Sequence, residues 1–267
     1  MTHVYGNNMA KTSLSSEITN LDFIKTFAVI CMIIDHIGFY FFPDVLWFRA
    51  VGRLGGVPIW FFLIGYANSR HIPNSWLIGA LILAVMDLFL FSQVFAMNVL
   101  VTIVLLRLGI DHIMNFVLQS RYIFWFAAIL LAFFYIPTNM VLEYGTLAVI
   151  CAMLGYMVRH KERLYALSFV TKYDYMAFIA FMVVANTILQ TSVFGFSVLQ
   201  EVFLFLATAA ITYILIAMEP TTYPQIKEEK LKTLLRFGGR KTLEIYVAHL
   251  VVFKILFWGL VVVGFYR

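Results

Sequence analysis

Residues 21–42 read LDFIKTFAVICMIIDHIGFYFF, an apolar stretch that contains ionisable side chains, among them Lys25, Asp35 and His36. A transmembrane α-helix needs about 20 mostly apolar residues to cross a hydrocarbon core roughly 30 Å thick. Charged and titratable groups inside a bilayer are expensive, so they are normally kept for a function and face a cavity. The stretch therefore predicts a membrane-spanning helix that carries functional polar groups.

The rest of the chain repeats this apolar pattern. Of its 267 residues, 63% are hydrophobic and 12% are charged, which excludes a separate soluble catalytic domain. The fold class expected is all-α, a polytopic transmembrane helical bundle of about nine or ten spans, with a polar cytoplasmic tail over 1–20 and a single membrane domain over 21–267. The tenth span depends on 92–112, which could also be re-entrant or two half-helices. The expected spans are 21–42, 54–69, 75–92, 96–110, 121–137, 141–158, 174–191, 199–217 and 242–265.

The distribution of positive charge predicts the orientation. Assigning alternate loops to the two sides puts most of the 19 lysines and arginines on the side of the N-terminus, which is therefore expected in the cytoplasm. The net charge of +5 then reflects membrane topology, and no nucleic-acid partner is expected. The hydrophilic segment 218–241 contains IKEEKLKTLLRF with helical spacing of its apolar residues. It predicts a cytoplasmic interfacial helix that either rests on anionic headgroups or binds a partner.

Lys25 and His36 are eleven residues apart, which places them on one face of the first helix, about 16 Å apart along its axis. Lys25 would lie near the cytoplasmic end, where it could simply extend its ammonium to the headgroups. His36 would lie deep in the membrane, where the alternative to a catalytic role is a packed histidine hydrogen-bonded to a neighbouring helix.

Arg53 opens the second polar cluster, in the stretch VGRLGGVPIWFFLIGYANSR over 51–70. It enters the membrane from the outer side at the depth expected for Asp35, so the two are predicted to pair. The pair could be a structural clamp, or Arg53 could also hold a substrate oxygen. Further polar residues expected inside spans are Asp87, Asn98, Thr102, Glu143, Tyr144, Tyr246 and His249.

The motifs of several enzyme classes are missing from the sequence. It contains no nucleotide-binding glycine loop, HExxH, CxxC or GxSxG, which excludes motif-recognised ATPases, zinc proteases and serine hydrolases. No metal site is expected. An enzyme that uses histidine as a base remains compatible with the sequence.

Five segments in order resemble the TraX family of membrane proteins: LDFIKTFAVICMIIDHIGFYF, VGRLGGVPIWFFLIGYANSR, MNVLVTIVLLRLG, LEYGTLAVICAMLGYMVR and TLEIYVAHLVV. One departure is the spacing from Arg53 to Pro58, a residue longer than the family pattern. The resemblance implies a bacterial inner-membrane protein that acetylates the N-terminus of conjugative pilin, with acetyl-CoA as donor. TraX proteins are also similar to acyltransferase family three, in which a basic residue and a histidine eleven apart on the first helix contact CoA and catalyse transfer. Lys25 and His36 match that spacing, with lysine in place of the usual arginine.

The function expected is therefore a membrane-embedded acyltransferase that uses acetyl-CoA or another acyl-CoA, with Lys25 contacting CoA. His36 would act as general base, or alternatively form an acyl-histidine, while Asp35 would pair with Arg53 or with the acceptor's ammonium group. The acceptor would be an amine or hydroxyl of a pilin-like peptide, a glycan or a small molecule. A proton-coupled secondary transporter and a non-enzymatic assembly factor are the other hypotheses. The residues expected to orient His36 or to hold the substrate are Arg53, Asn98, Glu143, Tyr144, Tyr246 and His249.

Overall fold

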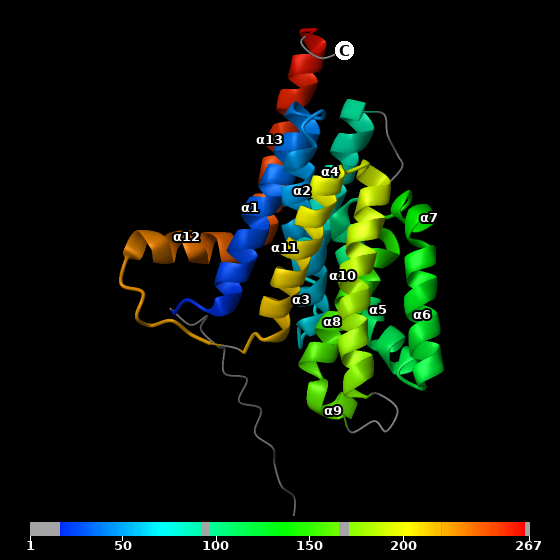
Figure 1. Ribbon diagram of the computed structural model, residues 1–267. Coiled ribbons are helices and arrows are strands. Elements are labelled where there is room, and N and C mark those ends of the chain that lie inside the picture. Colours follow the sequence, from blue (N-terminus) through cyan, green and yellow to red (C-terminus); the bar gives the residue numbers. More distant parts are fainter. Residues whose placement is uncertain (1–16, 92–96, 166–170, 220, 265–267) are drawn as a thin grey trace, which may run out of the picture.

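The computed structural model describes residues 17–91, 97–165, 171–219 and 221–264, and these ranges fold into helices with short connections (Figure 1). This confirms the all-α, polytopic membrane fold. Most of the tail predicted over 1–20 lies outside the described residues. The helices are α1 Asn20–Phe41, α2 Leu46–Gly55, η1 Gly56–Phe61, α3 Phe62–Tyr66, α4 Asn74–Phe91, α5 Val99–Val117, α6 Arg121–Phe133, α7 Tyr135–Asn139, α8 Gly145–Arg159, α9 Lys161–Tyr165, α10 Lys172–Phe194, α11 Val198–Ile216, α12 Glu229–Arg240 and α13 Thr242–Val262.

Six helical segments of the described chain are long and apolar enough to cross a membrane: α1, the continuous run α2–η1–α3, α5, α10, α11 and α13. Three shorter apolar helices, α4, α6 and α8, lie among them. Each stretch predicted to span thus contains a helix within its described residues. Figure 1 shows that α1 begins at one end of the bundle and α13 finishes at the other, as an odd number of passes requires. The predicted cytoplasmic placement of the α1 end stays a prediction.

The predicted start of the second span was wrong, and one alternative left open for 92–112 is not observed in its described part. The second span was expected over 54–69, but its helix begins at Leu46, two turns earlier. The half-helices considered within 92–112 are absent from its described part, because α5 is one uninterrupted helix from Val99 onward. Residues 92–96 lie outside the described residues.

The second span contains a π-helical segment, η1, around Pro58. Proline has no backbone N–H to continue the α-helical pattern, and a π-helical turn accommodates one extra residue in a helix. Such a turn can absorb one residue in the spacing from Arg53 to Pro58 within the helix; that this spacing is longer than in the family stays a prediction. Arg53 remains on the helix that packs against α1.

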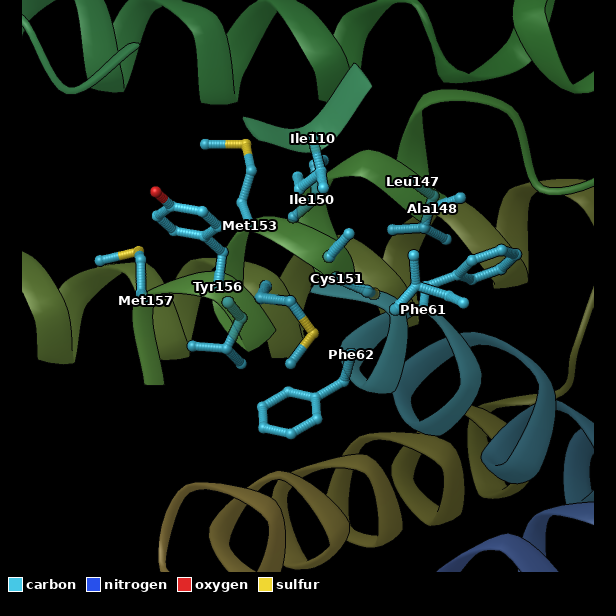
Figure 2. Packing of buried hydrophobic residues seen from close by; sticks show 14 of the residues in the cluster. Phe61, Phe62, Ile110, Leu147, Ala148, Ile150, Cys151, Met153, Tyr156 and Met157 are labelled. Carbon is cyan, nitrogen blue, oxygen red and sulfur yellow. The ribbon is translucent and has the colours of Figure 1, made fainter. Parts of the chain in front are cut away.

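Helix α8 forms the centre of the bundle and is almost entirely buried. Figure 2 shows Phe61 and Phe62 of the second span packed against α8 near Cys151. Two glycines let α3 and α8 approach closely: a Cβ on Gly65 would lie 1.8 Å from the carbonyl oxygen of Ala152, and one on Gly155 would lie 2.0 Å from that of Phe62. Small residues at such crossings allow backbone contact between membrane helices.

Replacing Gly155 by alanine is expected to destabilise the protein by about 1–3 kcal/mol, because the added methyl group has to push α3 away from α8. Thermal unfolding in detergent measures the change. Gly259→Ala is the matched control, since a Cβ at Gly259 meets no atom within 4 Å. Equal midpoints for the two variants would show that the close crossing of α3 and α8 does not exist.

Helix α12 lies crosswise to the long helices, beside the beginning of α1 (Figure 1). Gly238 and Gly239 bring its backbone against α1, and the Arg240 Nε lies 3.1 Å from the Asp22 Oδ1. Its outward side chains include Leu234 and Phe237, which are more than half exposed. The segment 218–241 thus contains the helix that the sequence predicted, apart from residue 220, which lies outside the described residues. Its contact with lipid headgroups stays a prediction.

Candidate functional site

Two cavities lie one after the other along α1 and α13. The first, here called the Lys25 cavity, has a volume of about 230 Å³, and the second, the His36 cavity, about 410 Å³. Tyr246 is the one described residue that lines both. The Lys25 cavity is lined by residues that include Leu21, Lys25, Met32, Trp60, Tyr66, Trp76, Arg107 and Leu243. The His36 cavity is lined by Asp35, His36, Phe39, Tyr40, Arg49, Arg53, Leu83, Asp87, Asn98, Glu143, Tyr246, Leu250, Lys254 and Phe257.

The order of lining residues shows how the cavities are arranged. Along α1, Lys25 and Met32 face the first cavity, and Asp35 and His36 face the second. Along α13, the lining residues before Tyr246 face the first cavity and those after it face the second. Because α1 begins at one end of the bundle and α13 finishes at the other, the two cavities follow each other across the protein (Figure 1).

His36 of α1 contacts His249 of α13 at the border of the two cavities. The Nδ1 of His36 lies 2.7 Å from the Nε2 of His249, and the two rings stack with centroids 5.0 Å apart. On its other side, the Nδ1 of His249 lies 2.6 Å from the carbonyl oxygen of Ile245. The Tyr246 ring is 6.1 Å from that of His36. The sequence placed both histidines inside spans, and the structure brings them together.

Asp35 forms ion pairs with two arginines of α2. The expected pair with Arg53 is present at 3.3 Å, and Arg49 lies closer, at 2.8 Å. All three side chains are nearly buried. A Cβ on Gly52 would lie 2.2 Å from the Asp35 Cβ, so this glycine lets α2 approach α1 closely enough for the pairs to form.

Arg49 was missed because the expected span began at 54, which left this residue in a loop. Its position four residues before Arg53 on one helix face was the signal that could have found it. Aromatic rings hold both guanidinium groups: Arg49 lies over Phe194 at 4.8 Å, and Arg53 lies over Phe194 at 4.5 Å and over Tyr144 at 4.9 Å. Tyr144 is thus placed against Arg53, and it has the left-handed φ of 68° just before α8.

Asn98 and Glu143 both line the His36 cavity. Asn98 lies just before α5 and Glu143 just before α8, and the backbones of these two connections are hydrogen-bonded to each other. Glu143 N–H donates to the carbonyl of Met97 at 3.0 Å. Asn98 caps α5, since its Oδ1 accepts from Leu100 N–H and its Nδ2 donates to the Ala80 carbonyl. Glu143 accepts from Val99 N–H through Oε2, while its Oε1 has no hydrogen-bond partner among the described residues. Asn98 is therefore occupied structurally, whereas Glu143 retains a carboxylate oxygen for a ligand.

Asp87 and Lys254 form an ion pair in the wall of the His36 cavity. It links α4 to α13. The sequence placed both residues inside spans without predicting that they pair. The contact neutralises two charges inside the bundle and leaves His36, Glu143 and the arginines as the groups that determine the character of the cavity.

Lys25 and Arg107 are the charged residues of the Lys25 cavity, whose described lining contains no carboxylate. The Lys25 ammonium forms no hydrogen bond or ion pair with the described residues. Arg107 lies over the Trp76 ring at 4.6 Å and donates to the His71 carbonyl. Arg107 lies within α5. The cavity therefore combines two cations with aromatic walls.

A comparison with protein families matches residues 20–257 to the model described as TraX protein. The chain belongs to the TraX family. It is 28% identical to the uncharacterized protein RP591 of Rickettsia prowazekii (strain Madrid E) over 238 residues, which cover 88% of this chain and 91% of that protein. No solved structure matches the chain. Membership of the TraX family suggests a conjugation-related membrane protein.

In this TraX protein the two cavities differ in chemistry. The Lys25 cavity offers cations and indole rings to an anionic ligand with an apolar arm. The His36 cavity offers an imidazole, guanidinium groups and a carboxylate oxygen to a polar ligand. Within the described ranges, no three His, Cys, Asp or Glu residues cluster closely enough to hold a metal ion.

Proposed function

We propose that this TraX protein is an acyltransferase that moves an acyl group, in the simplest case acetyl, from acyl-CoA in the Lys25 cavity to an acceptor in the His36 cavity. The observation that carries the proposal is the succession of the two cavities along α1 and α13, with His36 and Tyr246 where they adjoin. An enzyme that joins two substrates has to hold both against one catalytic group.

The Lys25 cavity suits the donor. The phosphates of CoA are anionic, and they would be attracted by the cations Lys25 and Arg107. The described lining of this cavity contains no carboxylate that would repel them. His36 is eleven residues beyond Lys25 on the helix, about 16 Å along its axis. An acyl group at His36 would therefore lie about that far from the phosphates at Lys25, a distance that the extended arm of CoA can span. The resemblance to acyltransferase family three supports the same division of roles between Lys25 and His36.

His36 would act as the general base. It accepts the proton from an amine or hydroxyl of the acceptor as the nitrogen or oxygen of that group attacks the thioester carbonyl carbon. When the tetrahedral intermediate collapses, the carbon–sulfur bond breaks and the protonated imidazole returns the proton to the CoA sulfur. The acyl group is then bonded to the acceptor, and free CoA leaves.

The acceptor would be an amine or a hydroxyl, such as the N-terminus of a pilin-like peptide. Asp35 was expected to hold either Arg53 or an acceptor ammonium. Its Oδ2 is paired with Arg49 and Arg53, and its Oδ1 is buried without a hydrogen-bond partner among the described residues. The carboxylate oxygen available to a cationic acceptor is instead the Oε1 of Glu143. A pilin-like peptide fits the conjugation-related family.

The predicted topology places the Lys25 cavity on the cytoplasmic side of the inner membrane, where acyl-CoA is found. Arg70, Arg121, Arg159, Lys161 and Lys172 lie in or beside connections at the end of the bundle where α1 begins. Positive residues in short loops favour the cytoplasmic side. The acceptor would then be modified from the opposite side or from within the bilayer.

Replacing Lys25 by alanine is expected to raise the KM for acetyl-CoA about 10- to 100-fold with little change in kcat, because a charge-assisted contact to phosphate contributes about 1.5–3 kcal/mol. Steady-state kinetics at saturating acceptor measures both constants. Lys172→Ala is the matched control, since Lys172 is exposed and lies outside both cavities. An unchanged KM in the Lys25 variant would mean that Lys25 only reaches toward the headgroups.

Purified protein incubated with radiolabelled acetyl-CoA and amine-bearing peptides tests the function itself. Transfer is expected to produce one free CoA thiol for each acetylated peptide. A transporter would instead move the label across a vesicle membrane without releasing the thiol, and an assembly factor would do neither. Either of the last two outcomes contradicts the proposal.

A further inference from the structure

The hydrogen bonds of the His36–His249 pair indicate which ring nitrogens carry protons. A backbone carbonyl can only accept a hydrogen bond, so the 2.6 Å contact with the Ile245 carbonyl requires a proton on Nδ1 of His249. With neutral rings, the Nε2 of His249 then has a lone pair and accepts from the Nδ1–H of His36, 2.7 Å away. A neutral imidazole carries one proton, so the Nε2 of His36 is left with the lone pair.

The position of the two rings fits this order. His36 lines the His36 cavity, whereas His249 is not among the residues that line it. The His249 ring lies behind His36, between the rings of Tyr246 at 5.9 Å and Phe253 at 5.5 Å, in edge-on contacts. Among the described residues, none hydrogen-bonds the Nε2 of His36. The chain from the Ile245 carbonyl through His249 to His36 thus ends at a nitrogen without a protein partner.

We propose that His249 is a positioning residue that holds His36 in the tautomer protonated on Nδ1, so that Nε2 of His36 is the atom that takes the acceptor proton. The catalytic consequence rests on the proposed acyltransferase function, but the tautomer does not. The second imidazole does here what a buried carboxylate does behind the histidine of a serine protease: it fixes the ring and selects the nitrogen that reacts.

His249 also has a role during the reaction. When His36 accepts a proton on Nε2, its ring becomes cationic, and its Nδ1–H donates more strongly to the His249 lone pair. Among the described residues, no carboxylate forms an ion pair with His36: Asp35 pairs with Arg49 and Arg53, and Asp87 pairs with Lys254. Glu143 accepts from Val99 N–H. The pair therefore stabilises the protonated base through a hydrogen bond rather than through a counter-ion.

Nitrogen-15 NMR of protein labelled in its histidines tests the tautomer without any substrate. The His36 signals, identified by their loss in His36→Gln, are expected to show a protonated Nδ1 and an unprotonated Nε2. In His249→Phe, which keeps a ring of similar size, this preference is expected to disappear. A proton on Nε2 of His36 in the unaltered protein would overturn the inference, whatever the activity proves to be.

Kinetics test the catalytic consequence. We expect His249→Phe to lower kcat about 10²- to 10³-fold while leaving the KM for acetyl-CoA unchanged, because His249 lines neither cavity. His249→Gln, whose side-chain oxygen can accept from His36 near the place of Nε2, is expected to recover at least tenfold of that loss. Equal kcat values for the two folded variants would show that His249 acts only through packing and would overturn its positioning role.

Discussion

His36→Ala is expected to lower kcat for acetyl transfer about 10²- to 10⁴-fold, the range over which a positioned general base accelerates a reaction. Without the imidazole, an attacking amine or hydroxyl would have to lose its proton to water, although both proposed substrate cavities would remain. The KM for acetyl-CoA is expected to change little, because the proposed donor site is at Lys25 and Arg107. Labelled acetyl-CoA with a peptide acceptor at saturation gives both constants.

The control for this variant is His112→Ala, which removes an exposed histidine of α5 outside both cavities. It should transfer acetyl at the unaltered rate. Thermal unfolding of both variants establishes that they fold. If folded His36→Ala retained the full kcat, His36 would be a packed histidine and the proposed chemistry would be wrong.

Asp35→Ala is expected to destabilise the protein by about 3–5 kcal/mol, the cost of leaving a buried charge without its partner. The Asp35 carboxylate forms ion pairs with two buried guanidinium groups, those of Arg49 and Arg53. Its loss leaves Arg49 with a hydrogen bond to the backbone carbonyl of residue 35, and both arginines with aromatic contacts but without an ion-pair partner among the described residues. The free energy of unfolding in detergent, measured with a chemical denaturant, reports the change.

Asp44→Ala provides the comparison for Asp35, because Asp44 is exposed in the connection between α1 and α2. Its stability should match that of the unaltered protein. Asp35→Asn keeps the shape but removes the charge, and it should lose most of the same free energy. If Asp35→Asn were as stable as Asp44→Ala, the ion pairs would contribute nothing and α1 would be held to α2 by packing alone.

Depth in the membrane was enough to predict the Asp35–Arg53 pair from sequence. The two residues were expected at the same depth in adjacent spans, so predicting their contact needed no knowledge of which distant helices touch. Arg49 escaped the same reasoning because hydropathy locates the start of a span poorly when the first turns contain charge and tryptophan. The helix begins at Leu46 because its charged residues find partners inside the protein.

The histidine pair shows what sequence alone could not predict. His36 and His249 lie on the first and last spans, and nothing in their local sequences indicates that α1 and α13 are neighbours. The same applies to Asp87 and Lys254, which meet across α4 and α13. Such contacts depend on the tertiary arrangement of helices whose apolar surfaces look alike.

Some residues expected in the site have structural partners. Asn98 caps α5, a position that the sequence concealed because the helix was expected to start at 96. Tyr144 supports Arg53 with its ring. Tyr246, expected to orient His36 or to hold the substrate, lines both cavities and so lies where the donor and acceptor would meet.

Sealed vesicles test the two-cavity account most directly. Radiolabelled acetyl-CoA is supplied outside vesicles that contain the protein, and a peptide with a free N-terminal amine is enclosed within them. Vesicles whose protein presents the Lys25 cavity outward should acetylate the enclosed peptide and release CoA outside, while vesicles with His36→Ala should not. Enclosed peptide that stays unlabelled would contradict transfer from one cavity to the other.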